Sequence, residues 1–465
     1  MSNAFIDQAL LERTVRHATA YLRSLPDRHV GARASRQDLL DALGGALPED
    51  GHESAAVVDD LAAAADRGAI GSAGPRYFGF VIGGALPASV AADWLTSTWD
   101  QNAGIFVTSP LSSVIEEIAR GWLLNLFSLP SDASLGFVTG CQMANFTCLA
   151  AARHAVLRTA GWDVEQDGLN GAPRISVVLG AEAHVTIFVA LRMLGLGVRN
   201  VRLVATDEQG RIKADDLRRT LKGIEGPAIV CAQAGNVNSG AFDPLREIGE
   251  AVREQGAWLH VDAAFGLWAA VSDELRHLLD GVDLADSWAT DAHKWLNVPY
   301  DCGVTIVRDL SAHRASMTSA AAYIQKTTGA ERDPMDWVPE FSRRARGVTV
   351  YAALRALGRR GIVDLIERSC ARARQFAELL SRDKRVKILN DVVLNQVLVR
   401  FGDSDEMTSQ VIALVQQEGT CWLAGTTWHD MAAMRISVSN WATSESDVRR
   451  SAEAVLGCLS RASRD

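Results

Sequence analysis

One lysine stands in a setting that could give it chemistry. Lys294 lies in the stretch SWATDAHKWLNVPYDCG (residues 287–303), after a short apolar run and beside Trp295. Burial there would disfavour the charged ammonium and lower the pKa of the lysine. A lysine with a lowered pKa is a nucleophilic amine of the kind that forms Schiff bases. The alternative is a surface lysine whose stem lies along Trp295, the better interpretation for a lysine taken alone.

An acid upstream favours the chemical interpretation. The segment WLHVDAAFG (residues 258–266) reads as a buried strand that ends in Asp262. Open α/β sheets bind ligands at the carboxyl ends of their strands, although a lone Asp there is as often a helix cap. Together, Asp262 and Lys294 meet the needs of pyridoxal phosphate. That cofactor requires a lysine for its aldimine and an acid that keeps its pyridine nitrogen protonated.

The motifs HVDAA (residues 260–264) and DAHKW (residues 291–295) resemble those of the group II pyridoxal-phosphate-dependent amino-acid decarboxylases. This family includes aromatic-amino-acid, tyrosine, glutamate and diaminobutyrate decarboxylases. The resemblance runs from about Arg76 to the C-terminus. It implies an α/β protein of fold type I, with a mainly parallel sheet in a large domain and a smaller α+β C-terminal domain. It also implies a homodimer.

The resemblance gives five residues roles in the cofactor site. Lys294 would carry the cofactor, and Asp262 would hold the pyridine nitrogen. His184 would stack on one face of the ring and Ala264 would press on the other, whereas a lone His is more often a helix cap. His293 would contact the phosphate or the substrate carboxylate.

The turn Gly140-Cys141-Gln142 joins an apolar strand to the start of a helix. Free N–H groups at a helix N-terminus suit a phosphate, although without the lysine motif a plain turn would be preferred. The family usually has Gly-Gly or Gly-Thr and then Ser-Glu here, so this chain keeps the backbone donors, whereas the hydroxyl contact is lost or replaced by Gln142. Asp291 stands where some members have Asn. A carboxylate would repel a phosphate, so we expect Asp291 to point away or to cap a helix.

Three further candidates rest on weaker patterns. Asn236 follows a predicted strand and could reach the cofactor or orient Asp262, although a turn is the favoured interpretation of Asn-x-Asn-Ser-Gly. Phe80, near a Gly-Gly pair, and Phe106 are candidates for the substrate pocket, with core aromatics around a tight turn as the alternative. The aromatic decarboxylases carry more polar residues where this chain has residues 82–86, which argues against a catechol or phenol substrate.

Residues 311–339 show little periodicity, and a loop of this length in a compact enzyme is usually functional. The resemblance implies a mobile loop, which we bound at residues 309–340, whose tyrosine protonates the substrate carbon after CO₂ leaves. Tyr323 is the candidate, with an ordinary half-buried tyrosine as the alternative. Arg343, just beyond, reads as part of a solvated basic face.

The elements that must position these residues alternate along the chain. Apolar runs at 175–179, 201–205, 228–232, 258–262 and 304–307 read as strands with helical patterns between several of them, which indicates a parallel sheet covered on both faces. Residues 1–70 read as a helical arm that cannot bury its apolar face alone and is expected to clasp a second subunit, or else to pack on its own. We assign residues 71–345 to a large cofactor-binding domain and residues 346–465 to a small domain.

Composition narrows the class of protein. The net charge of −9, without a basic block, argues against a nucleic-acid partner. Seven scattered cysteines without a CxxC spacing favour neither a disulfide framework nor a metal site, and fit a reducing cytoplasm. We find no secretory signal and no apolar run long enough to cross a membrane.

These observations favour the pyridoxal-phosphate-dependent decarboxylation of an L-amino acid to its amine and CO₂. Oxidative decarboxylation to an aldehyde, C–C lysis and transamination start from the same cofactor adduct and stay open. A non-catalytic cofactor-binding protein is the second alternative. The tyrosine in the loop favours simple decarboxylation, because aldehyde-forming relatives tend to lack it.

Overall fold

A seven-stranded sheet forms the centre of the protein. The computed structural model describes residues 7–199, 201–319 and 331–464. The strands lie in the order β1-β7-β6-β5-β4-β2-β3. Their bounds are β1 Ser134–Val138, β2 Ser176–Gly180, β3 Arg202–Val204, β4 Ala228–Gln233, β5 Trp258–Asp262, β6 Ser287–Asp291 and β7 Gly303–Val307. Strands β6, β5, β4, β2 and β3 are parallel, which confirms the predicted α/β fold with a mainly parallel sheet.

Strand β7 is the exception, because it runs antiparallel to both of its neighbours, β1 and β6. The chain reaches β7 from β6 through the short loop that holds Lys294, and so short a connection permits only an antiparallel return. The lysine loop is therefore a tight link between two central strands.

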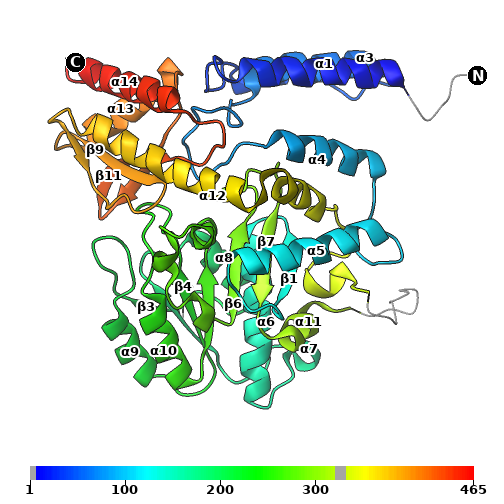
Figure 1. The fold of residues 1–465 in the computed structure, drawn as a ribbon, viewed down its shortest axis with the longest axis vertical. Coiled ribbons are helices and arrows are strands. Elements are labelled where there is room, and N and C mark those ends of the chain that lie inside the picture. The colour runs from blue at the N-terminus through cyan, green and yellow to red at the C-terminus, as the bar shows by residue number, and fades with distance from the viewer. Residues whose placement is uncertain (1–6, 200, 320–330, 465) are drawn as a thin grey trace, which may run out of the picture.

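Helices cover both faces of this sheet (Figure 1). Along β4, Val230 packs into the core on one face, whereas Ile229 and Cys231 pack into the core on the other. Such two-sided burial is what the continuous apolar runs predict. The helices of this part are α4 Pro87–Trp99, α5 Pro110–Leu126, α6 Cys141–Thr159, α7 Val164–Asp167, α8 Val185–Met193, α9 Ala214–Lys222, α10 Leu245–Gln255 and α11 Leu310–Met317.

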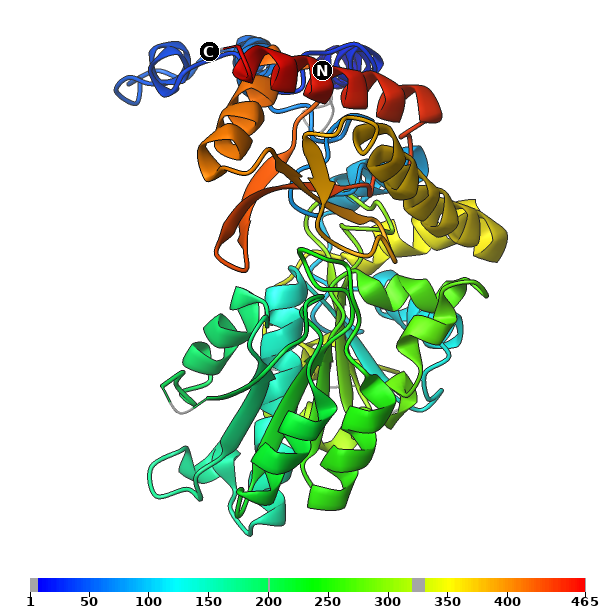
Figure 2. The ribbon, with the colours of Figure 1, turned by 90° about the vertical axis from the view of Figure 1, so that its left-hand side faces the viewer.

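A second, smaller sheet lies beyond the long helix α12 (Gly347–Leu380), as Figure 2 shows. Helix α12 is interrupted at Gly358, whose φ of 58° suits a residue without Cβ. The four strands of the small sheet are antiparallel in the order β10-β11-β9-β8. Their bounds are β8 Val386–Ile388, β9 Gln396–Phe401, β10 Ala424–Trp428 and β11 Met431–Ser437, and the accompanying helices are α13 Asp405–Glu418 and α14 Glu445–Ala462.

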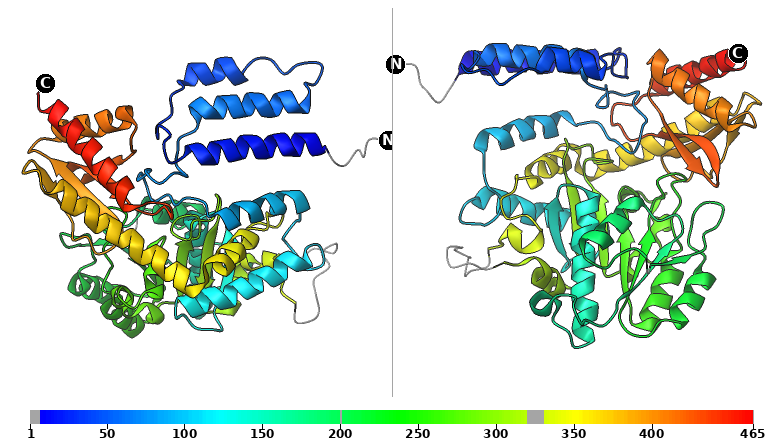
Figure 3. Two further views of the ribbon diagram at one scale, coloured as in Figure 1. Left: turned by 45° about the horizontal axis from the view of Figure 1, so that its top comes forward. Right: turned by 180° about the vertical axis from the view of Figure 1, so that it is seen from behind.

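The N-terminal helices α1 (Gln8–Ser24), α2 (Arg36–Leu43) and α3 (Ser54–Gly68) form a layer at one end of the molecule (Figure 3). None of the three buries a residue completely. Leu11 and Val15 on α1 are 61% and 45% exposed, and Leu61 on α3 is 56% exposed. This layer therefore presents apolar side chains that the described chain does not cover.

The predicted loop at residues 309–340 is only partly a loop. Its first residues form α11, capped by Asp309, whose carboxylate accepts the N–H of Ala312. A 3-10 turn covers Pro334–Trp337. The helix is held by His313, which is fully buried and contacts the carbonyl oxygen of Trp337 at 2.9 Å. These anchoring contacts are long-range and have no signature in the local periodicity.

Candidate active site

Lys294 lies in the turn between β6 and β7, with 20% of its side chain exposed. Its Nζ atom is 2.9 Å from Oδ2 of Asp291, the last residue of β6. Burial alone would lower the pKa of Lys294, but the charge and hydrogen bond of Asp291, with the charge of Asp262, outweigh it and hold that pKa above its usual value. The prediction of a lowered pKa is therefore wrong for the protein without its cofactor.

Asp291 also caps a helix, one of the two positions expected for it. Its Oδ1 atom accepts the N–H of Cys141 at 2.6 Å, at the start of α6. The same oxygen lies 3.5 Å from Nε2 of His293. One buried carboxylate thus joins the lysine, the histidine beside it and the predicted phosphate-binding turn.

The glycine pair near Phe80 serves the lysine loop. A Cβ on Gly83 would lie 1.9 Å from the carbonyl oxygen of Lys294, so only glycine permits this approach of two backbones. The Gly84 N–H donates to Oδ1 of Asn297 at 2.6 Å, and Asn297 Nδ2 donates to the carbonyl oxygens of Trp295 and Ser439 at 2.9 Å each. These contacts tie the lysine loop to both domains.

Asp262 ends β5 with both oxygens facing side chains of α6. Oδ2 accepts from Nδ2 of Asn145 at 3.2 Å, and Oδ1 lies 3.5 Å from Sγ of Cys141. The N–H of Ala264 also approaches Oδ1, at 3.3 Å. Asp262 and Lys294 are thus linked through Cys141 and Asp291.

The two predicted histidines have defined hydrogen bonds. His184 caps α8, where its Nδ1 atom lies 2.8 Å from Oγ1 of Thr186. Nδ1 of His293 accepts the N–H of Cys302 at 3.1 Å, so its proton belongs on Nε2, facing Asp291. Burial lowers the pKa of both rings. Each histidine is accordingly held as a neutral imidazole.

Tyr300 is a site residue that the sequence argument missed. Its ring stacks on His293 with 4.3 Å between centroids, and its side chain is largely exposed. The only signal in the sequence is its position six residues after Lys294.

Arg435, on β11, was also missed. Its side chain is buried, and the one side-chain hydrogen bond that it makes to the described residues is long, 3.4 Å from Nη1 to Oδ1 of Asn238. Its Nε atom has no partner within the described chain. The positive charge of Arg435 contributes to lowering the pKa of His184, after the larger effect of burial. A guanidinium without a carboxylate partner is suited to an anionic group of a ligand.

The other described candidates make their contacts outside the group formed by Lys294, Asp291, Cys141 and Asp262. Asn236 makes a turn, because its Oδ1 accepts the N–H groups of Asn238 and Ser239, so the suggestion that it orients Asp262 is wrong and Asn145 makes that contact instead. Phe80 is 54% exposed and stacks on Trp422. The N–H of Phe106 donates to Asp333. Tyr323 lies outside the described residues.

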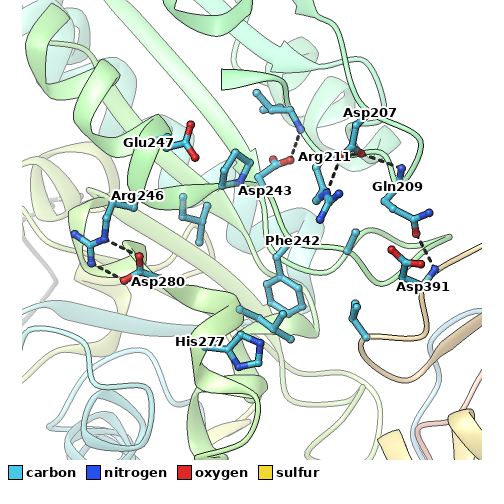
Figure 4. Close-up of a pocket in the computed structure, with 16 residues that line it drawn as sticks. Asp207, Gln209, Arg211, Phe242, Asp243, Arg246, Glu247, His277, Asp280 and Asp391 are labelled. Carbon is cyan, nitrogen blue, oxygen red and sulfur yellow. Dashed lines mark hydrogen bonds and ion pairs between the residues drawn. The ribbon is translucent and has the colours of Figure 1, made fainter. Parts of the chain in front are cut away.

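A surface cleft of about 470 Å³ lies away from Lys294 (Figure 4). Both arginines that line it are paired, Arg211 with Asp207 at 2.7 Å and Arg246 with Asp280 at 2.7 and 2.6 Å. The described lining of the cleft therefore offers an anion no free guanidinium. We also find, among the described residues, no cluster of three His, Cys, Asp or Glu side chains that could hold a metal, and no helix long and apolar enough to span a membrane.

The site fits pyridoxal phosphate on its own geometry. Lys294 supplies an amine, and Asp262 supplies a carboxylate that approaches it from another strand. Gly140 begins α6, and a Cβ there would come 3.2 Å from the ring of His293, so this turn is a cradle that a side chain would fill. The remaining N–H groups of the first turn of α6, beginning with Gln142, face the same end of the helix.

Curated relatives resemble the chain over most of its length. It is 26% identical to tryptophan decarboxylase 1 of Oryza sativa subsp. japonica, over 97% of this chain and 93% of that protein. It is 25% identical to 4-hydroxyphenylacetaldehyde synthase of Rhodiola rosea, over 92% and 90%. It is 26% identical to the aromatic-L-amino-acid decarboxylase of Bacillus atrophaeus, over 79% and 77%.

Solved structures share the fold. The Oryza sativa tryptophan decarboxylase, solved with pyridoxal phosphate and tryptamine, superposes with a TM-score of 0.91 at 24% identity, covering 98% of this chain and 97% of that one. The apo form of the mouse protein CSAD gives a TM-score of 0.88 at 23% identity, covering 98% of each chain.

The family model described as the pyridoxal-dependent decarboxylase conserved domain matches residues 37–401, which is most of the chain. That range includes Lys294, Asp262 and the turn at Gly140. The family resemblance and the cofactor predicted from the sequence are confirmed. The chain belongs to the pyridoxal-dependent decarboxylases, enzymes that use pyridoxal phosphate as cofactor and act as carboxy-lyases on amino acids.

Proposed function

We propose that the protein converts an L-amino acid to its amine and CO₂. The observation that carries this proposal is the linked set of Lys294, Asp291, Cys141 and Asp262 at the carboxyl ends of β5 and β6. It brings together an amine, a carboxylate and a helix N-terminus, the three groups that the cofactor needs.

Each residue has a separate task in this proposal. Nζ of Lys294 would hold the cofactor. Asp262 would accept a hydrogen bond from the protonated ring nitrogen and so keep it protonated, and the first turn of α6 would bind the phosphate. His184 would lie against one face of the ring and Ala264 against the other. When bound, the cofactor accepts the electron pair of the breaking bond to the carboxylate.

Proton delivery decides the product. Tyr323 would donate its hydroxyl proton to the substrate carbon after CO₂ departs, which gives the amine. A tryptophan decarboxylase and a 4-hydroxyphenylacetaldehyde synthase are both related to this chain, so the aldehyde is the second candidate product. The presence of Tyr323 in the loop supports the amine.

Substrate recognition would involve the missed residues. Arg435 has a buried guanidinium without a carboxylate partner in the described chain, which supports a role in binding a carboxylate of the substrate. The exposed rings of Phe80 and Tyr300, with Phe106, would contact the substrate side chain. None of these three aromatic side chains carries a charge.

The protein would act as a homodimer. Besides the exposed leucines of α1 and α3, helix α4 exposes Trp94 and Trp99 by 43% and 42%. An apolar cavity of about 540 Å³ between α1 and α4 is lined by Leu22, Val90 and Trp94, among others. A second subunit would cover this surface, as expected for an arm that cannot bury its apolar face alone. A cytoplasmic location is supported by seven cysteines that are all free.

The test is product analysis of the cofactor-loaded protein with a panel of L-amino acids, by mass spectrometry. A product lighter by CO₂ that keeps its amine supports the proposal and names the substrate. An aldehyde or keto acid would replace it with another reaction of the same cofactor. Lys294→Ala is the control, because appreciable amine production by that variant would exclude Lys294 as the cofactor-binding residue.

A further inference from the structure

A row of buried polar side chains lies behind Asp262. Trp258 Nε1 donates to Oγ of Ser287 at 2.9 Å, and Ser287 Oγ lies 3.0 Å from Nδ1 of His260. Nε2 of His260 is 2.9 Å from Oδ1 of Asn145, whose Nδ2 donates to Oδ2 of Asp262 at 3.2 Å. Ser287, His260 and Asn145 are each fully buried.

The hydrogen atoms of this row can be assigned from its carboxylate end. As a carboxylate, Asp262 can only accept, so Asn145 turns its N–H₂ group toward Oδ2 of Asp262 and its Oδ1 toward His260. Because Oδ1 is an acceptor, the proton of a neutral His260 is on Nε2. Nδ1 of His260 then accepts from the hydroxyl of Ser287, which in turn accepts from the indole of Trp258.

His260 is neutral in this row. Burial lowers the pKa of His260 to about 4, although the charge of Asp262 opposes the effect. The row therefore supplies Asp262 with a hydrogen-bond donor but places no positive charge beside it. The negative charge of Asp262 stays available to the protonated ring nitrogen of the cofactor.

The amide of Asn145 makes a second contact. Its N–H₂ group carries two hydrogens, and the second lies toward Oγ1 of Thr186, at 3.5 Å from Nδ2. Thr186 can then donate to Nδ1 of His184 at 2.8 Å, which leaves the proton of His184 on Nε2. One amide thus contacts both the carboxylate assigned to the ring nitrogen and the threonine that orients the histidine assigned to the ring face.

We propose that Asn145 is a positioning residue that, with its partner His260, holds Asp262 as an ionised acceptor for the ring nitrogen and sets the tautomer of His184. This inference rests on the proposed roles of Asp262 and His184, and it adds residues that act on the cofactor only through them. Loss of the amide would remove a hydrogen-bond donor from Asp262 and leave the buried N–H of His260 without an acceptor.

The test compares two ligands on the cofactor-free protein: pyridoxal phosphate and its analogue in which CH replaces the ring nitrogen. The wild-type protein should bind pyridoxal phosphate more tightly than the analogue, because only the natural cofactor can bond to Asp262. Asn145→Ala should lose about tenfold of this preference, the effect of one hydrogen bond to a charged group. Affinities are read by tryptophan fluorescence, and the visible spectrum of the loaded protein should change in parallel.

Asn395→Ala is the matched control. Asn395 is also fully buried, and its Nδ2 donates to the carbonyl oxygen of Val438 at 3.0 Å, away from Asp262. A purely structural loss weakens both ligands equally, so this control should keep the wild-type ratio of affinities. An Asn145→Ala protein with the wild-type ratio and spectrum would overturn the inference.

A second pair of variants covers the case in which Asn145→Ala does not fold. His260→Leu removes the donor to Asn145 and should lower the preference for pyridoxal phosphate, whereas His260→Gln keeps an N–H₂ donor and should restore part of it. Equal ratios in both would also overturn the inference. A wild-type protein without any preference would instead refute the role of Asp262 in the proposed function.

Discussion

The carboxylate of Asp291 lies 2.9 Å from Nζ of Lys294, and its second oxygen accepts the N–H of Cys141 at 2.6 Å. Without the cofactor, one side chain thus binds both groups that we propose for cofactor binding, the amine of Lys294 and the first N–H of α6. The ion pair also explains why the pKa of Lys294 is raised despite burial.

Asp291→Asn should therefore ease attachment of the cofactor. The amide removes the negative charge that stabilises the ammonium, so the pKa of Lys294 should fall and the free amine should appear at lower pH. The rate of cofactor attachment is followed by visible absorbance at a series of pH values. We expect the midpoint of this pH profile to move by about one pH unit or more toward acid.

Asp364→Asn is the charge-matched control, because Asp364 pairs with Arg368 on the surface of α12. That variant should keep the wild-type profile. An unchanged profile for Asp291→Asn would mean that the ion pair does not limit access to the amine.

The sequence predicts the strands of the large sheet well, because their apolar runs are continuous and β5 coincides with the predicted residues 258–262. It could not predict that β7 is antiparallel, because an apolar run reads the same in either direction. The helix within residues 309–340 was missed because its anchor, His313, bonds to Trp337 and Ser134 across the fold.

In the site, too, residues in local motifs could be predicted from the sequence, whereas residues that act through long-range contacts could not. Lys294 and Asp262 stand in local motifs, whereas Asn145 reaches Asp262 across 117 residues of sequence and carries no local mark. From the sequence, burial predicts a lowered pKa for Lys294. The pKa is instead raised, because Asp291, three residues earlier, lies beside the amine. Arg435 belongs to the small sheet, so its approach to His184 required the arrangement of two domains.

Arg435→Gln should weaken substrate binding without removing the cofactor. A neutral side chain of similar size loses the charge-assisted bonds to a carboxylate, so KM should rise about tenfold or more. Steady-state kinetics on the identified substrate check this, and the visible spectrum shows whether the cofactor remains bound. An unchanged KM would exclude Arg435 from carboxylate binding.

Arg343 was predicted to lie on a solvated face, and the structure contradicts this. It is buried, with Nη1 2.6 Å from Oε1 of Glu116 and Nη2 donating to the carbonyl oxygen of Phe137 at 2.7 Å. Arg343→Ala leaves the carboxylate of Glu116 buried alone and should reduce the free energy of unfolding by about 3–5 kcal/mol.

The adjacent Arg344 is the control for this prediction, because its ion pair with Asp93 is solvent-exposed. Arg344→Ala should cost less than about 1 kcal/mol in urea denaturation. Equal losses in the two variants would contradict the difference in burial.

His260 should make stability depend on pH. Its pKa lies at about 4 in the folded protein, below the usual value of 6.5, so the unfolded chain binds the proton first as the pH falls. The stability contributed by the neutral ring is complete above pH 6.5 and is lost toward pH 4, by about 1.4 kcal/mol per pH unit. His260→Gln cannot titrate, so its unfolding free energy should fall less between these values than that of the wild type. Parallel pH profiles would contradict a neutral buried ring.

Tyr323→Phe should divert the reaction from amine to aldehyde. If its hydroxyl protonates the substrate carbon, its loss should slow amine formation about 10²-fold or more. The unprotonated carbon can instead be oxidised by O₂, and hydrolysis by one water then yields the aldehyde and ammonia, with hydrogen peroxide from the O₂. Oxygen uptake and mass spectrometry of the products measure this division, with Tyr351→Phe as the control because Tyr351 packs on Trp122 instead. Unchanged amine production would assign the proton to another donor, and Tyr300, whose ring stacks on His293 beside Lys294, would then be the next residue to test.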